Sequence, residues 1–296
     1  MSTQVATPAI TLKYVKTIGI VNNGYNGRGF ANPYNVAVSR DGRIFVLNRC
    51  DPARAAAIRV GICTLDEEYL GEFGKGFGSG DGQFAWPVAM AFDSQERLYI
   101  TDEHHHRISI FETSGTFLGK WGVFGRDAGQ LNGPAGIAID AQDHVYIADQ
   151  HNHRIQKFTT DGTYILGWGE AGTHDGQFNL PWGVAVDTQG VVYVADWGNE
   201  RVQVLGPDGS FQLLLRGQAT LSKWAEEFFA SNPDEWETRQ ISNLMPPLPT
   251  HLNTPYHISS QTEPYFWGPV SVTLDRENRL YVPETNRHRV QIYQKA

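Results

Sequence analysis

The sequence has few of the residues that define several common protein classes. Its two cysteines, Cys50 and Cys63, are too few for a disulfide framework, so we expect two free thiols. No stretch approaches the roughly eighteen consecutive apolar residues of a membrane-spanning helix, and we expect no membrane partner. The first residues lack a basic segment followed by an apolar run, so we expect no signal peptide. These absences predict a soluble, cytoplasmic protein.

Positive charge is also scarce. The 296 residues carry a formal net charge of −8, which opposes the broad basic surface that phosphate binding needs, and we expect no nucleic-acid partner. Only three methionines stand against 31 glycines and 15 prolines, a balance typical of short elements joined by tight turns. The 41% hydrophobic content is enough to fill a core, so the sequence predicts a globular chain without a helical bundle.

A repeat of about 47 residues runs through most of the chain. Four segments align without gaps from Pro87, Pro134, Pro181 and Pro269, and a fifth from Pro33 carries about six extra residues. Each copy has two alternating apolar runs, a turn with an acidic residue or Asn, and a third run, and most are followed by a fourth run. Four antiparallel strands per unit predict an all-β fold, a β-propeller of four-stranded blades.

The last copy stops after its third strand, and the missing strand is predicted near the N-terminus, from Ile10, where it would close the ring and remove an exposed sheet edge. Five blades are clear. Six remain an alternative, because Pro181 and Pro269 are 88 residues apart. The intervening segment, residues 218–265, has six prolines and no valine, which favours five blades plus an insertion.

The motifs P-x-G-[IV]-A-[IV]-D, [LV]-Y-[IV]-A-D-x-x-N-[HE]-R-[IV] and G-x-x-D-G-Q-F closely resemble the NHL repeat. The resemblance covers almost all of residues 10–217 and 266–294. It implies a propeller fold but no single function, because such propellers include lyases, scaffolds and RNA binders.

The insertion is predicted to be partly helical. Leu221, Trp224 and Phe228 have helical spacing, and Ser231 or Asn232 before Pro233 is typical of a second helix start. In a propeller this connection opens on the same face as the turn between the second and third strands. We therefore expect one domain, 1–296, in which 218–265 caps the ligand-binding face. The alternative is that the insertion only fills an irregular sector.

Residues that recur in every blade are predicted to be architectural, and residues unique to one blade are free for chemistry. The acidic residue of the first turn should form that turn, and that of the second turn should join an arginine in a network between blades. His106, His153 and His288 share one position and are predicted to be structural on the same grounds.

The variable positions of the second turn, and those after the blade prolines, should cluster at the mouth of the central channel. His104 and His151 hold equivalent places on adjacent blades, so we predict them as catalytic residues or as ligands of one divalent metal ion. The alternative is that both are solvated turn residues. A third ligand would come from Glu103, Asn286 or His257. The predicted substrate-binding residues are Tyr34, Arg49, Trp86, Trp182, Trp197, Asn286 and His257.

Two functions fit these residues. The first is an enzyme of lyase or hydrolase type with a capped pocket for a small molecule. The second is a non-catalytic module that binds a peptide, sugar or protein. The repeat also resembles, more distantly, the peptide-amidating lyases, whose zinc histidines follow blade prolines. Here Tyr, Val, Ala, Trp and Val occupy those places, so that zinc chemistry is not expected.

Overall fold

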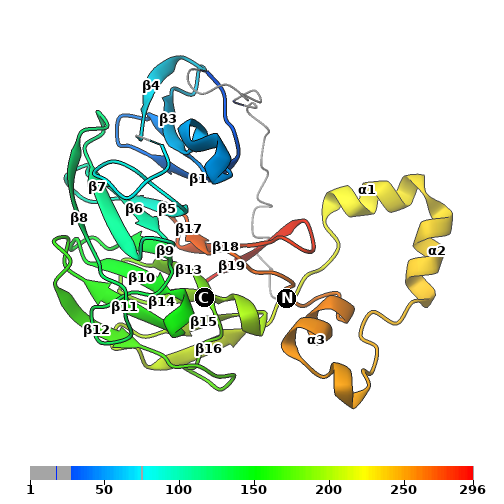
Figure 1. Ribbon diagram of the computed structural model, residues 1–296. Helices are drawn as coiled ribbons and strands as arrows, with labels where there is room; N and C mark the ends of the chain where they lie inside the picture. Colours follow the sequence, from blue (N-terminus) through cyan, green and yellow to red (C-terminus); the bar gives the residue numbers. More distant parts are fainter. Residues whose placement is uncertain (1–17, 19–27, 75, 296) are drawn as a thin grey trace, which may run out of the picture.

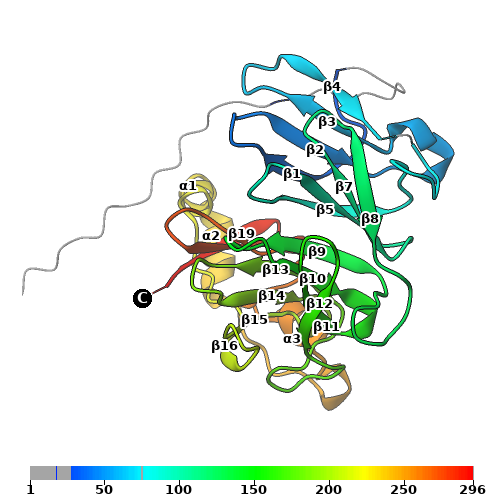
Figure 2. The ribbon, with the colours of Figure 1, turned by 90° about the vertical axis from the view of Figure 1, so that its left-hand side faces the viewer.

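The computed structural model of the protein describes residues 18, 28–74 and 76–295. Five antiparallel sheets are arranged around a common centre, and the strands of each sheet follow one another in sequence order (Figure 1). Figure 2, turned by 90°, shows the blue first blade above the green third and fourth blades. The prediction of a five-bladed propeller is confirmed, and the alternative of six blades is wrong, because residues 218–265 form helices and loops instead of a sheet.

Each sheet is one blade, numbered in chain order. Blade 1 contains β1 (Pro33–Val38), β2 (Ile44–Asn48), β3 (Arg59–Cys63) and β4 (Tyr69–Phe73). Blade 2 contains β5 (Pro87–Phe92), β6 (Leu98–Asp102), β7 (Arg107–Phe111) and β8 (Phe117–Trp121). Blade 3 contains β9 (Pro134–Ile139), β10 (Val145–Asp149), β11 (Arg154–Phe158) and β12 (Tyr164–Trp168).

Blade 4 contains β13 (Pro181–Val186), β14 (Val192–Asp196), β15 (Arg201–Leu205) and β16 (Phe211–Leu215). Blade 5 contains β17 (Thr273–Leu274), β18 (Arg279–Glu284) and β19 (Arg289–Gln294). The short 3-10 turns are η1 (Pro52–Ala57), η2 (Gln150–Asn152), η3 (Trp197–Asn199) and η4 (Thr250–Leu252). The fourth strand of blade 5, predicted from Ile10, lies outside the described residues, apart from Ile18.

The first turn of blades 2 to 5 is closed by its aspartate, as predicted. In blade 4, Asp187 Oδ1 accepts from the backbone N–H groups of Gln189 and Val191 at 2.9 and 3.0 Å. The same pair of backbone bonds forms at Asp93, Asp140 and Asp275. Each aspartate therefore accepts from backbone N–H groups of its turn that would otherwise bond only to water.

The inner strands β1, β5, β9, β13 and β17 pack side by side around the centre. Glycine allows the closest of these contacts: a Cβ on Gly136 would lie 2.6 Å from the Trp182 carbonyl oxygen, and one on Gly183 would lie 2.8 Å from Ser271 Cα. Between blades the core is apolar, and one cluster joins Tyr99 and Ile108 of blade 2 to Ile147 and Phe158 of blade 3. Burial of this surface is the main source of stability.

The insertion contains α1 (Lys223–Ser231), α2 (Pro233–Ile241) and α3 (Pro255–Gln261), which lie to one side of the blades in Figure 1. The first two helices were predicted, and the third was missed. Ser222 caps α1 by accepting from Ala225 N–H. Neither α1 nor α2 has a buried residue, whereas α3 packs against η3 of blade 4.

Two further observations concern the cysteines and the possibility of a membrane-spanning helix. Cys50 and Cys63 are both free and buried. Within the described part of the chain, no helix combines the length and the apolar character needed to cross a bilayer.

Candidate functional site

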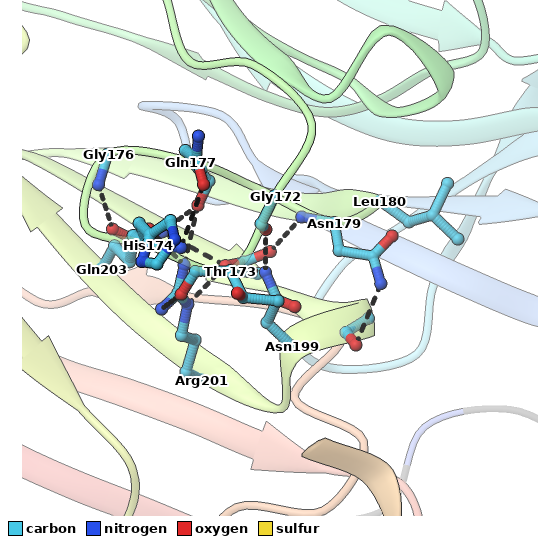
Figure 3. A network of polar contacts seen from close by, with 12 residues as sticks. Gly172, Thr173, His174, Gly176, Gln177, Asn179, Leu180, Asn199, Arg201 and Gln203 are labelled. Carbon is cyan, nitrogen blue, oxygen red and sulfur yellow. Dashed lines mark hydrogen bonds and ion pairs between the residues drawn. The ribbon is translucent and has the colours of Figure 1, made fainter. Parts of the chain in front are cut away.

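The second turn of blades 2 to 5 is anchored by a buried carboxylate, whereas blade 1 has Asn48 at this position. Figure 3 shows the network around this turn in blade 4. Arg201 Nε donates to Asp196 Oδ2 at 2.6 Å, and its two Nη atoms donate to the carbonyls of Thr173, His174 and Gln177. Asn199 donates to Gly172 O and to the same carboxylate. The predicted network of aspartate, arginine and backbone is therefore confirmed, and it ties the loop before blade 4 to the third strand.

Blade 2 departs from this pattern around Asp102. His105 stands where blade 4 has Asn199, and its Nδ1 lies 3.0 Å from Asp102 Oδ2. Arg107 donates to three loop carbonyls but not to the carboxylate. Ser109 replaces the glutamine of blades 3 and 4. Two buried atoms of the described chain, Arg107 Nε and Ser109 Oγ, are left without a hydrogen-bond partner here.

The same turn carries the predicted catalytic residues to the mouth of the propeller. Glu103 and His104 directly follow β6, and the Glu103 N–H donates to Trp86 O at 3.0 Å. His151 lies in η2 of the next blade, where its N–H donates to Asn132 O at 3.0 Å. These backbone bonds hold both turns against the loops that precede β5 and β9.

The two turns and blade 1 enclose a cavity of about 310 Å³, which we call the histidine pocket. It is lined by Arg49, Trp86, Glu103, His104, His106 and His151. The structure thus brings together both predicted catalytic histidines and two of the predicted binding residues, Arg49 and Trp86.

The Arg49 side chain is held in this pocket by an ion pair and by two aromatic rings. Its Nη2 donates to Glu103 Oε2 at 3.0 Å, and its guanidinium carbon lies 4.6 Å from the Trp86 ring centroid and 4.9 Å from that of Tyr34. Such cation–π contacts stabilise a partly desolvated arginine. His151 Nε2 lies 4.0 Å from the other Glu103 oxygen. The carboxylate therefore faces a fixed cation on one side and an imidazole on the other.

A second cavity, the channel pocket, lies at the centre of the ring and measures about 460 Å³. All five blades contribute to it, among others through Tyr34, Val88, Gly136, Trp182, Trp197 and Asn286. Trp182 and Trp197 form an edge-to-face pair with centroids 6.0 Å apart. Its described lining carries no charged side chain, which suits the uncharged part of a ligand.

The two pockets meet at Tyr34, which lines the channel pocket and contacts Arg49 of the histidine pocket. Burial raises the pKa of Tyr34, and Glu103 adds to the rise while Arg49 opposes it. The single ring of residues expected from the sequence is therefore divided into two neighbouring cavities.

The remaining predictions about the site concern His257 and the metal ion. His257 lies on α3, its Nδ1 is 2.8 Å from Thr254 Oγ1, and it lines neither pocket. Among residues 18, 28–74 and 76–295, no group of three or more His, Cys, Asp or Glu side chains could hold a metal ion. A metal on His104 and His151 thus has no third ligand in the described chain.

Comparison with known proteins places the repeat. The NHL repeat model matches residues 84–111, 131–158 and 178–205, which lie in blades 2, 3 and 4. Three of the five blades are NHL repeats. No curated protein sequence matches the chain.

Solved structures that are similar to this chain share its propeller fold at low identity. They include a streptogramin B lyase, with 14% identity, a TM-score of 0.55 and coverage of 95% of this chain and 72% of the other. A virginiamycin B lyase from Staphylococcus aureus, crystallised with quinupristin, shares 13% identity with a TM-score of 0.52, and the match covers 89% of this chain and 70% of the other. A protein of unknown function from Bacteroides thetaiotaomicron shares 18% identity with a TM-score of 0.58, covering 90% and 60%.

Sequence reasoning missed His106 as a pocket residue within the NHL repeats. Its position recurs in blades 3 and 5, which correctly indicates a structural role, and its Nδ1 accepts from Gly133 N–H at 3.0 Å. The ring nevertheless lines the histidine pocket. Burial lowers the pKa of His106, and the neighbouring His104 and His151 lower it further. The three-histidine run could have indicated this position, but recurrence argued against it.

Proposed function

We propose that this protein is an enzyme of lyase or hydrolase type that acts on a small molecule. One observation carries the proposal: a pocket with His104, His151 and Glu103 opens beside an uncharged aromatic channel pocket, and the two meet at Tyr34. The channel would hold the body of the substrate, and the histidines would act on the part that reaches the mouth.

The chemistry available to these residues is proton transfer. Glu103 Oε1 lies 4.0 Å from His151 Nε2, so the carboxylate faces the imidazole. His151 then serves as the acid that protonates a leaving oxygen, and His104 serves as the base that removes a proton from carbon or from water. Removal of a carbon-bound proton gives elimination, the lyase outcome, and removal of a water proton gives hydrolysis.

The neighbouring structures support the proposal only through the fold. Those named streptogramin B and virginiamycin B lyases are enzymes built on a propeller, and their identity of 13–14% to this chain carries no substrate across. We further propose a small molecule or peptide as partner, with no nucleic acid and no membrane, and a cytoplasmic location.

The insertion is part of the same proposal. Its helix α3 packs on η3, which carries the channel residue Trp197, and Tyr256 of α3 contacts Trp267 with ring centroids 5.7 Å apart. This contact supports residues 218–265 as a cap beside the mouth. None of the described residues that line either pocket comes from that segment.

The test is a turnover screen. The protein and its His104→Ala, His151→Ala double variant are incubated with a panel of esters, lactones, cyclic peptides and sugar derivatives, including quinupristin, and consumption is followed by mass spectrometry. We expect consumption of one compound class, lost at least a hundredfold in the variant because two proton-transfer groups are removed. Turnover that is unchanged in the variant would contradict the proposal.

A binding module is the second candidate, and the channel pocket favours it. Trp182, Trp197 and Tyr34 form an aromatic surface without any charged group in the described lining. If this function is correct, the same panel gives a ligand that binds without being consumed, and Trp197→Ala weakens binding while the double histidine variant does not.

A further inference from the structure

One position links consecutive blades through a side-chain acceptor. It follows the second turn and has a left-handed backbone, with φ of 53° at His106, 54° at His153 and 53° at Glu200. His106 Nδ1 accepts from Gly133 N–H at 3.0 Å, His153 Nδ1 from Leu180 N–H at 3.2 Å, and Glu200 Oε2 from Gly268 N–H at 2.5 Å. In each case the donor lies just before the next blade. We call this position the joint between two blades. Its side chain has to supply a hydrogen-bond acceptor for that backbone N–H.

The joint fixes the tautomer of its histidines. A backbone N–H can only donate, so the ring nitrogen it faces must be unprotonated. A neutral His106 accordingly carries its proton on Nε2. The pKa of His106, lowered by burial, His104 and His151, keeps the ring in this neutral form near pH 7.

Only one of these joints adjoins the proposed site. Of the three residues, His106 alone belongs to the described lining of the histidine pocket. The blade contact occupies Nδ1, so Nε2–H is the hydrogen-bonding group that remains for the pocket.

The charges of the pocket indicate what this donor would meet. Glu103 is the single carboxylate of the described lining and is ion-paired with Arg49 at 3.0 Å. The remaining polar groups of that lining are three imidazoles and the indole of Trp86. Arg49 is held between Tyr34 and Trp86. An anionic oxygen is the group that such a donor set accommodates best.

We propose that His106 is a substrate-binding residue whose Nε2–H holds an anionic oxygen, a carboxylate or phosphate, of the substrate. This inference rests on the proposed function and gives its substrate class: a small molecule with an anionic group at the mouth and an uncharged body in the channel.

The test separates the joint from the donor. His106→Asn keeps an acceptor, because the amide oxygen takes the place of Nδ1, and Glu200 shows that an oxygen serves at this joint in blade 4. It removes the Nε2 donor. His153→Asn is the matched control, since it makes the same change at a joint outside the pocket. Benzoate and inorganic phosphate are the anionic probes, and benzamide is the neutral one.

The readout is NMR of protein with ¹⁵N-labelled histidine. We expect His106 with Nε2 protonated and Nδ1 unprotonated, and we expect benzoate or phosphate, but not benzamide, to shift His106. His106→Asn should weaken that anion at least tenfold, whereas His153→Asn should leave its affinity within twofold. The spectrum of the unaltered protein tests the tautomer even if a variant fails to fold.

Three results would overturn the inference: an Nδ1-protonated His106, no shift with either anion, or equal affinity in His106→Asn. Its failure is distinguishable from that of the proposed function. Turnover of an uncharged compound that depends on His104 and His151 would retain the enzyme and reject the anionic substrate class. Anion binding at His106 without turnover of any compound would retain the anionic ligand class and reject the enzyme.

Discussion

Blades 2 and 4 have the same strands and the same turns, but their buried networks differ. In blade 4, Asn199, Arg201 and Gln203 all donate to Asp196. In blade 2, the side-chain partner of Asp102 is His105, and Arg107 Nε and Ser109 Oγ remain unpaired. Blade 2 is also the blade that contributes Glu103, His104 and His106 to the histidine pocket. Of these two blades, the one with the less complete network is therefore the one that supplies most of the candidate catalytic residues.

The pKa values of the two aspartates differ as well, but not in the order of their number of side-chain donors. Burial raises the pKa of Asp196 above its usual value despite its hydrogen bonds. Burial also raises the pKa of Asp102, but the bonds from His105, Ala85 and Trp86 outweigh it and leave the net pKa below the usual value. Asp102 therefore binds its proton less tightly, because its turn donors and an imidazole surround it.

The largest expected effect is the loss of the complete network. Arg201→Met leaves the buried Asp196 carboxylate without its cation and should lower the free energy of unfolding by about 3–5 kcal/mol. Arg107→Met in blade 2 removes only bonds to carbonyls, and we expect about 1–3 kcal/mol. Urea denaturation of both variants measures the difference. Equal losses would show that the two networks are equivalent.

A pH effect distinguishes the joint of blade 4 from those of blades 2 and 3. Burial raises the pKa of Glu200 to about 7. The pKa of Glu200 is thus higher in the folded than in the unfolded protein. The stabilisation of the fold by the protonated Glu200 side chain is therefore complete below pH of about 4.5 and is lost as the pH rises through about 7. Glu200→Gln stays neutral, so above pH 7 it should be more stable than the unaltered protein by about 2 kcal/mol.

Thermal and urea unfolding between pH 4 and 8 check this prediction. Glu68→Gln, at an exposed turn, is the control and should not change the pH profile. A Glu200→Gln profile parallel to that of the unaltered protein would contradict the raised pKa.

Restoring the repeat in blade 2 should stabilise it. His105→Asn with Ser109→Gln supplies the side chains that blade 4 uses at Asn199 and Gln203, and a gain of about 0.5–2 kcal/mol is expected. The gain is measured as an increased urea midpoint at constant slope. If the double variant loses stability, the space around Asp102 does not match that around Asp196, and the comparison fails.

The smallest effect is expected outside the blades. Trp224 on α1 is 83% exposed, so Trp224→Gln should change the free energy of unfolding by less than about 0.5 kcal/mol. Differential scanning calorimetry would detect a larger loss. Such a loss would mean that α1 packs on a surface in solution and is not the free projection seen in Figure 1.

Most of the fold could be predicted from the sequence, because the same residue types recur at the same positions of successive blades. The turn aspartates, the Asp196 and Arg201 pair, and α1 and α2 all follow from recurrence or local spacing. Helix α3 was missed because Pro255 to Gln261 has no apolar period, and it is held by packing on η3.

The candidate site was only partly predictable. Register placed His104 and His151 on adjacent turns, and the structure brings them into one pocket. Register could not show that Arg49 is held between two rings, or that His106 serves a joint and a pocket together, because both depend on contacts between blades. The position of His257 could not be predicted either, because it depends on the path of the insertion, which the repeat does not specify.

The most direct test of the central claim is a crystal structure of the protein with a compound that the panel shows to be bound or consumed. We predict the compound at the mouth of blades 2 and 3, with its reacting or anionic group against His104, His106 and His151 and its body in the channel pocket, against Trp182 and Trp197. A compound bound instead between α1 and α2, against Phe229 and Trp236, would contradict it.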